Sequence, residues 1–206
     1  MKPYEEQYYI VRNVYNEDTV YLKPTKQTGK RKYKSSQLVF GEEPLIFEAS
    51  FDKAFNKKGK QPVFGDAHMD GSYPVVSQKV YELLKYLNVN NFQLYPAIIM
   101  DPNGNYIENY YFFNIYDRLN CVDFDKSELI NYKKEALRYT VRKFILKSEV
   151  LDPIEEENRF ILHPNKVFTA PMIVHEYIVN IFKKLKIKTI QFIPLSDYAL
   201  GSEFSN

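Results

Sequence analysis

The chain has 206 residues, of which 45% are hydrophobic and 26% charged, a composition that is globular and excludes a disordered or fibrous protein. Its net charge of +2 is too small to steer the whole molecule toward nucleic acid or an anionic membrane. The one cysteine, Cys121, cannot form an internal disulfide. The first residues hold no apolar run of signal-peptide length, and no run reaches the roughly 20 residues of a membrane helix. We therefore expect a soluble cytoplasmic protein with no membrane span.

The N-terminal part is typical of short strands separated by polar loops. Strands are predicted over residues 4–14, 38–40 and 45–51, where aromatic and branched apolar residues gather. The stretch Lys23–Lys34 is rich in Lys and Arg and has no apolar periodicity, which indicates a solvated loop. A second polar loop is expected over Phe55–Gly65.

A clearer pattern begins at Tyr73. A short strand over 74–76 leads to Ser77, a residue suited to cap the helix that we predict as far as Leu87. Next come a buried strand at Phe92–Met100, a turn at Asp101–Gly104 and a returning strand at Tyr106–Ile115, so the sequence predicts a hairpin.

Irregular structure is expected over residues 117–135 because this stretch is polar. Two further short strands are predicted at Val141–Leu146 and Arg159–Leu162, with an acidic loop, Asp152–Glu157, between them.

The strand–helix–strand pattern occurs twice, at about 73–99 and 170–196. At one constant spacing the apolar helix positions match pairwise, as Val80 with Ile178, Leu83 with Ile181, Leu84 with Phe182 and Leu87 with Leu185. Gln93 also matches Gln191, and Pro96 matches Pro194. We infer an internal repeat and an α+β fold in which two amphipathic helices lie on a mixed β-sheet. We expect residues 1–60 to be a β-rich segment packed on a main domain of residues 61–206.

Several segments resemble a known bacterial family by their order along the chain. They are PVVS at 74–77, FQLYP at 92–96, YYFFN at 110–114, CVD at 121–123, and the closing block from APMIV at 170–174 to IQFIP at 190–194. The family is the immunity proteins of polymorphic toxin systems, and the resemblance covers about residues 60–196. It implies a cytoplasmic antidote that binds a cognate secreted toxin, and it transfers no catalytic residue.

Two other kinds of function stay open from the residues themselves. Asp66, His68 and Asp70 alternate, so on a strand they would point the same way and could bind a divalent metal of a metal-dependent enzyme. The flanking glycines favour an ordinary loop instead. The basic and aromatic residues of Lys23–Lys34 and Phe55–Lys60 could hold single-stranded nucleic acid, although lysine-rich loops are commonly only solubilising.

A toxin-binding protein needs a surface with a few aromatic or Arg anchors and a charged rim. Candidate contacts lie in loops: the acidic run Glu155, Glu156 and Glu157, the segment Tyr116, Asp117 and Arg118, and the carboxylates Asp66 and Asp70. An acidic loop suits a basic toxin groove, and a solvated charged turn is the alternative for each. We expect no cofactor, and the sequence leaves the oligomeric state open.

Overall fold

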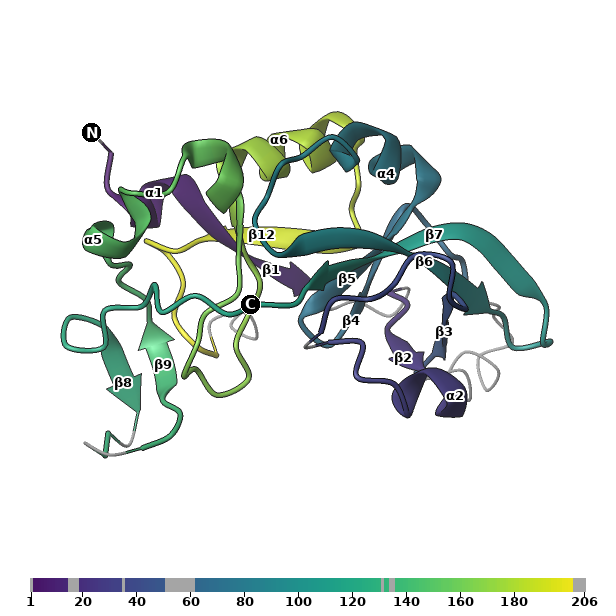
Figure 1. Cartoon of the computed structure of the whole chain (residues 1–206), viewed down its shortest axis with the longest axis horizontal. Coiled ribbons are helices and arrows are strands. Elements are labelled where there is room, and N and C mark those ends of the chain that lie inside the picture. The colour runs from purple at the N-terminus through teal and green to yellow at the C-terminus, as the bar shows by residue number, and fades with distance from the viewer. Residues whose placement is uncertain are drawn as a thin grey trace.

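The computed structural model describes residues 2–14, 19–34, 36–50, 62–130, 132–133 and 136–201, and these form an α+β protein (Figure 1). The predicted fold class is confirmed. The helices of this part are α1 (Tyr4–Gln7), α2 (Lys26–Gly29), α4 (Gln78–Leu84), α5 (Ser148–Leu151) and α6 (Glu176–Lys184), with a 3-10 turn at Glu156–Arg159. No helix in these ranges has both the length and the apolar character needed to cross a membrane.

A six-stranded mixed sheet forms one half of the molecule. Its order is β2 (Leu22–Pro24), β3 (Leu45–Ala49), β6 (Phe92–Met100), β7 (Tyr106–Ile115), β5 (Tyr73–Ser77) and β4 (Ala67–Asp70). The β3–β6 pair is parallel and the other pairs are antiparallel. Tyr21, beside β2, bridges to Met69 of β4, so the two edges of this strongly curved sheet approach each other. Buried rings of Phe47 and Phe112 stack inside, with centroids 5.7 Å apart.

The other half is a four-stranded antiparallel sheet. Its order is β10 (Ile161–Leu162), β11 (Ile173–His175), β1 (Tyr8–Asn13) and β12 (Ile190–Pro194). The N-terminal strand β1 therefore lies in the centre of a sheet otherwise built from the C-terminal part of the chain. The proposed division near residue 60 stays a prediction, because residues 51–61 lie outside the described ranges.

The repeat is present as β5–α4–β6 and β11–α6–β12, and each unit encloses a central antiparallel strand, β7 in the first and β1 in the second. The registers also agree, since each central strand places a tyrosine between matched partners: Tyr111 between Val76 and Pro96, and Tyr9 between Val174 and Pro194. The equivalence thus extends to a third strand, which follows its unit in one case and precedes it in the other.

Helices α4 and α6 contact each other and lie together on one side of the sheets, along the top of Figure 1. Ile178, Ile181 and Phe182 of α6 are buried as predicted. The first helix ends at Leu84 instead of Leu87, and its Leu83 is 49% exposed. The prediction of a core-facing Leu83 was therefore wrong.

Several other boundaries differ from the sequence-based prediction. Residues 4–7 are helical instead of extended, because α1 turns the chain into β1. The basic stretch Lys23–Lys34 contains part of β2 and helix α2, which Thr25 caps by accepting a hydrogen bond from Thr28 N. No strand forms over 38–40, where the chain makes a tight turn.

The region after β7 is more ordered than its polarity suggests. Strand β8 (Glu128–Ile130) pairs with β9 (Thr140–Lys143) in a separate hairpin, at the lower left of Figure 1. The predicted strand 141–146 therefore begins and ends earlier. In the predicted strand 159–162, Arg159 ends the 3-10 turn and only Ile161–Leu162 form the short β10.

Candidate functional site

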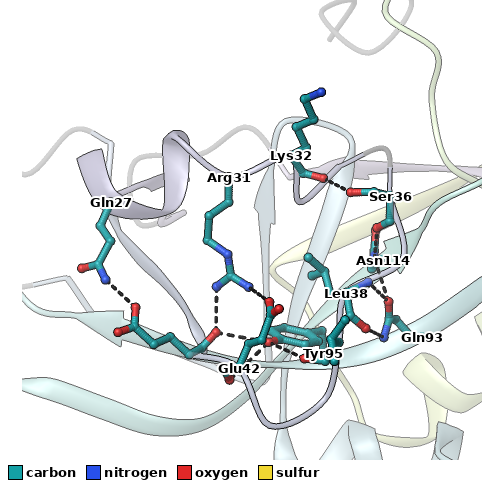
Figure 2. A network of polar contacts seen from close by, with 11 residues as sticks. Gln27, Arg31, Lys32, Ser36, Leu38, Glu42, Gln93, Tyr95 and Asn114 are labelled. Atoms are coloured by element: carbon teal, nitrogen blue, oxygen red, sulfur yellow. Dashed lines mark hydrogen bonds and ion pairs between the residues drawn. The ribbon is translucent and has the colours of Figure 1, made fainter.

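A buried polar network fixes residues 36–43 against β6 and β7 (Figure 2). The Gln93 amide accepts a hydrogen bond from Leu38 N at 2.7 Å and donates one to Leu38 O at 3.0 Å. Asn114 of β7 donates to the same Gln93 oxygen at 3.0 Å and to Ser36 O at 2.9 Å. Because Gln93 is only 8% exposed and Asn114 fully buried, these bonds are shielded from water and hold the segment at a fixed height above the sheet.

The far end of the same segment is held by Tyr95 and Arg31. The Tyr95 hydroxyl lies 3.2 Å from the carbonyl oxygens of both Val39 and Glu43, which accept its proton. Arg31 donates to Glu43 O at 2.7 Å and pairs with the Glu42 carboxylate at 3.3 Å. Figure 2 shows these contacts converging near Glu42 and Tyr95.

A polar ridge, defined as Tyr116–Arg118, follows the end of β7. Tyr116 N donates to Asn91 O at 3.0 Å, and the Asn91 amide donates to the Asp117 carboxylate at 3.0 Å. The other Asp117 oxygen accepts from Arg118 N at 2.7 Å. Asp117 is exposed and its two neighbours are half-buried, so the ridge presents a positioned carboxylate to solvent.

Two hollows flank this ridge and share Ile115, Asp117 and Arg118 as walls. The first, named the Asn158 hollow, has a volume of about 100 Å³ and is also lined by Asn91 and Asn158. The second, named the Lys34 hollow, measures about 270 Å³.

The Asn158 hollow contains an unsatisfied acceptor. Asn158 Oδ1 is buried and has no hydrogen-bond partner, a state that costs about 1–3 kcal/mol for a desolvated polar atom. The backbone of Asn158 is fixed, because its carbonyl accepts from Asn90 N at 3.1 Å and its N–H donates to Glu155 O at 3.0 Å.

The predicted acidic run Glu155, Glu156 and Glu157 lies in the chain between Ile154 and Asn158, which both line the Asn158 hollow. All three carboxylates are exposed. The structure therefore brings this run and the ridge to one hollow, although the two segments are far apart in sequence.

Asp70 lies beneath the Lys34 hollow instead of on its surface. It is 4% exposed, and its carboxylate accepts from the Tyr33 hydroxyl and pairs with Lys34 Nζ, both at 2.8 Å. Burial first, and then the Asp70 charge, raise the pKa of Tyr33. Because Asp70 pairs with Lys34, a wall of the hollow, it supports the hollow from below. The Tyr73 hydroxyl also holds this part of the chain, since it donates to Lys34 O at 3.1 Å and lies 3.3 Å from His163 Nδ1.

His163 also lines the Asn158 hollow and, through Tyr73, connects it to Lys34 of the Lys34 hollow. Burial, reinforced by the nearby Arg118 charge, lowers the pKa of His163 to about 4. The imidazole is therefore neutral at physiological pH, and Arg118 supplies the positive charge between the hollows.

The hypothesis of a metal site at Asp66, His68 and Asp70 is wrong, because the three side chains have separate partners. Asp66 accepts from Ser77 Oγ at 2.8 Å and pairs with Lys79 at 3.2 Å. His68 Nε2 accepts from Gly65 N and its Nδ1 faces Val20 O, and burial lowers its pKa to about 4. Among the described residues no group of three His, Cys, Asp or Glu could hold a metal ion.

The basic stretch Lys23–Lys34 offers less free charge than its composition suggests. Lys23 pairs with Glu48 at 3.2 Å, and Arg31 and Lys34 are engaged in the contacts given above. The second basic stretch, Phe55–Lys60, lies outside the described residues.

Sequence reasoning did not identify Asn91, Asn158 or His163 as parts of a site. Asn91 has a positive φ of 55°, a backbone state for which Asn is favoured, and its position just before a predicted strand was the only local signal. Asn158 and His163 carry no signal of their own, because only the fold brings them to Asp117.

The fold and this face together define an α+β protein of two equivalent units, with a solvent-open polar surface supported by buried hydrogen bonds. A comparison with protein-family models matches residues 6–197 to the immunity protein family Imm11, and the chain belongs to that family. The match extends beyond the resemblance over about residues 60–196 and includes most of the first 60 residues. A comparison with curated proteins finds no match.

Proposed function

We propose that this immunity protein binds a cognate secreted toxin of a polymorphic toxin system and blocks it by direct contact in the cytoplasm, without catalysing a reaction. Family membership supports the general role. The observation that carries the contact proposal is the Asn158 hollow, around which the ridge Tyr116–Arg118 and the run Glu155–Glu157 gather. Asn158, one of its walls, has a side-chain oxygen that is buried and has no hydrogen-bond partner in the described part of the chain.

The charge of this rim indicates the kind of toxin surface that fits. Asp117 and the three glutamates are exposed, and within the described residues none of these four carboxylates forms an ion pair with a Lys or Arg. Glu156 lies 3.9 Å from the His175 imidazole, and burial lowers the pKa of that imidazole. A basic toxin surface would complement the rim and accelerate association.

The test is co-expression of this protein with the toxic domain encoded by the neighbouring gene, scored by growth and then by co-purification. We expect rescue and a stable complex. Replacing Asp117 and Glu155–Glu157 by Lys should weaken the complex by about 100-fold, because like charges then oppose each other. Glu108→Lys is the matched control, since Glu108 is exposed near the opposite end of the β6–β7 hairpin.

Failure of the wild-type protein to protect cells or to bind the toxic domain would contradict the antidote role. Equal loss of binding in the rim variant and in the Glu108→Lys control would contradict the location of the interface. The second outcome leaves the antidote role intact.

A further inference from the structure

A third hollow, named the Phe40 hollow, lies beside the Asn158 hollow and has a different character. It measures about 230 Å³ and is lined chiefly by apolar and aromatic side chains, among them Phe40, Tyr81, Leu87 and Phe92. Phe92 follows Asn91, a wall of the Asn158 hollow, so consecutive residues at the start of β6 line the two hollows.

Phe40 is exposed in spite of its size. Its side chain is 64% accessible and that of Val39 is 63% accessible, although Val39 directly follows the buried Leu38. Adjacent exposed apolar side chains beside an apolar hollow are typical of a surface that a partner covers.

The position of Phe40 is set by a tight turn. Glu42 N donates to Val39 O at 3.3 Å, which closes a four-residue turn with Phe40 at its first corner and Gly41 at its second. Gly41 has a φ of 97°, a conformation that other residues rarely adopt. The turn thus holds Phe40 outward through backbone geometry.

The buried network described above holds the turn itself. Gln93 binds Leu38 on one side, and Tyr95 binds Val39 and Glu43 on the other, as Figure 2 shows. The Phe40 ring also lies 5.8 Å from the Tyr95 ring. A side chain that is ordered before binding loses little conformational entropy when a partner covers it, so this arrangement favours affinity.

We infer that the Phe40 hollow is the apolar anchor of the toxin interface, and that its occupant is a basic toxin surface carrying one exposed aromatic or branched aliphatic side chain. The charge part of this assignment follows from the exposed carboxylates of Asp117 and Glu155–Glu157, which form no ion pair with a Lys or Arg in the described ranges. The apolar part follows from the walls of the hollow. This inference rests on the proposed function and adds to it the chemistry of the partner.

Lys85 also lines the hollow and could attract an acidic toxin group if its charge were free. Lys85 Nζ pairs with Glu82 at 2.5 Å and lies 6.0 and 5.1 Å from the ring centres of Tyr81 and Tyr86. Because its charge is already engaged on α4, the hollow favours an apolar occupant over an anionic one.

The experiment measures the Kd of the purified toxic domain for the whole protein and for two phenylalanine variants. Phe40→Ala should weaken binding by about 10- to 100-fold, the range of anchor residues at protein interfaces. Phe168→Ala is the matched control, because Phe168 is 58% exposed and lines none of the three hollows. It should bind within about twofold of wild type.

The outcomes separate the two proposals. If the wild type binds and Phe40→Ala binds equally well, the apolar anchor is refuted while the antidote role stands. An equal loss in Phe168→Ala also refutes the anchor, because the effect is then not local. If the wild type does not bind, the proposed function fails and this inference fails with it. Urea denaturation of Phe40→Ala, expected to match wild type, confirms that any loss is not due to unfolding.

Discussion

Replacing Gln93 by leucine removes the side chain that holds residues 36–43, while keeping a similar volume. The substitution deletes the bonds to Leu38 N at 2.7 Å and Leu38 O at 3.0 Å. It also deletes the bond from Asn114, which keeps its second acceptor, Ser36 O, at 2.9 Å. Two backbone groups of Leu38, a residue only 8% exposed, are then left without a partner.

The expected loss of stability follows from those two groups. Each desolvated backbone group left unpaired costs about 1–3 kcal/mol, and the burial of a leucine in place of an amide offsets part of this sum. We therefore expect Gln93→Leu to lower the free energy of unfolding by about 2–4 kcal/mol, a large share of the roughly 5–15 kcal/mol of a typical domain. Urea denaturation followed by circular dichroism measures the difference.

The repeat supplies the control. Gln191 occupies the equivalent position in β12, is half-buried and makes one hydrogen bond, to Asn13 O at 3.0 Å. Gln191→Leu should cost about 0.5–1.5 kcal/mol, the net value of one such bond. A loss in Gln93→Leu no larger than in Gln191→Leu would refute the argument that the Gln93 network holds the Phe40 turn.

Three further outcomes are expected. Burial lowers the pKa of both His68 and His163 to about 4, below the unfolded value, so stability is full above about pH 6.5. The free energy of unfolding should fall by roughly 3 kcal/mol per histidine as the pH approaches 4. Urea denaturation at pH 7 and pH 5 detects the change, and equal stability at the two pH values would contradict it. Cys121 is buried, which raises its thiol pKa to about 12, so iodoacetamide should modify it only in denaturant, as mass spectrometry shows. Asp101→Ala removes the acceptor of Asn105 N at 2.8 Å in the β6–β7 turn and should lower the temperature of thermal unfolding, as calorimetry measures; an unchanged temperature would contradict a stabilising role of this bond.

The β6–β7 hairpin was predictable end to end because its signals are local. The strand residues Phe92–Met100 and Tyr106–Ile115 are continuous runs of high strand propensity, and Asp101–Gly104 contains turn residues at fitting positions. The short helices α1 and α2 were missed because each is a single turn of four residues, too short to show a helical period.

The third strand of the repeat was missed for a different reason. Residues 8–13, YYIVRN, match residues 110–115, YYFFNI, in register, but one strand precedes its unit and the other follows it. A comparison at one constant spacing therefore cannot align both the helices and the central strands. Of the candidate site, the polar character of residues 116–118 and 155–157 could be predicted from the sequence. That these two segments lie near each other could not, because it depends on the fold.

The two units have the same registers, so the position of the candidate interface depends on how they differ. In the second unit Gln191 binds its own central strand, through Asn13 O. In the first unit the matched Gln93 binds both Asn114 of its central strand and the backbone of Leu38, so the same residue type also holds an added segment on the sheet. That segment carries Phe40 and leads back to Lys34, which line two of the three hollows. The repeat thus supplies a rigid frame, and the N-terminal segment fixed on one unit turns that frame into a binding face.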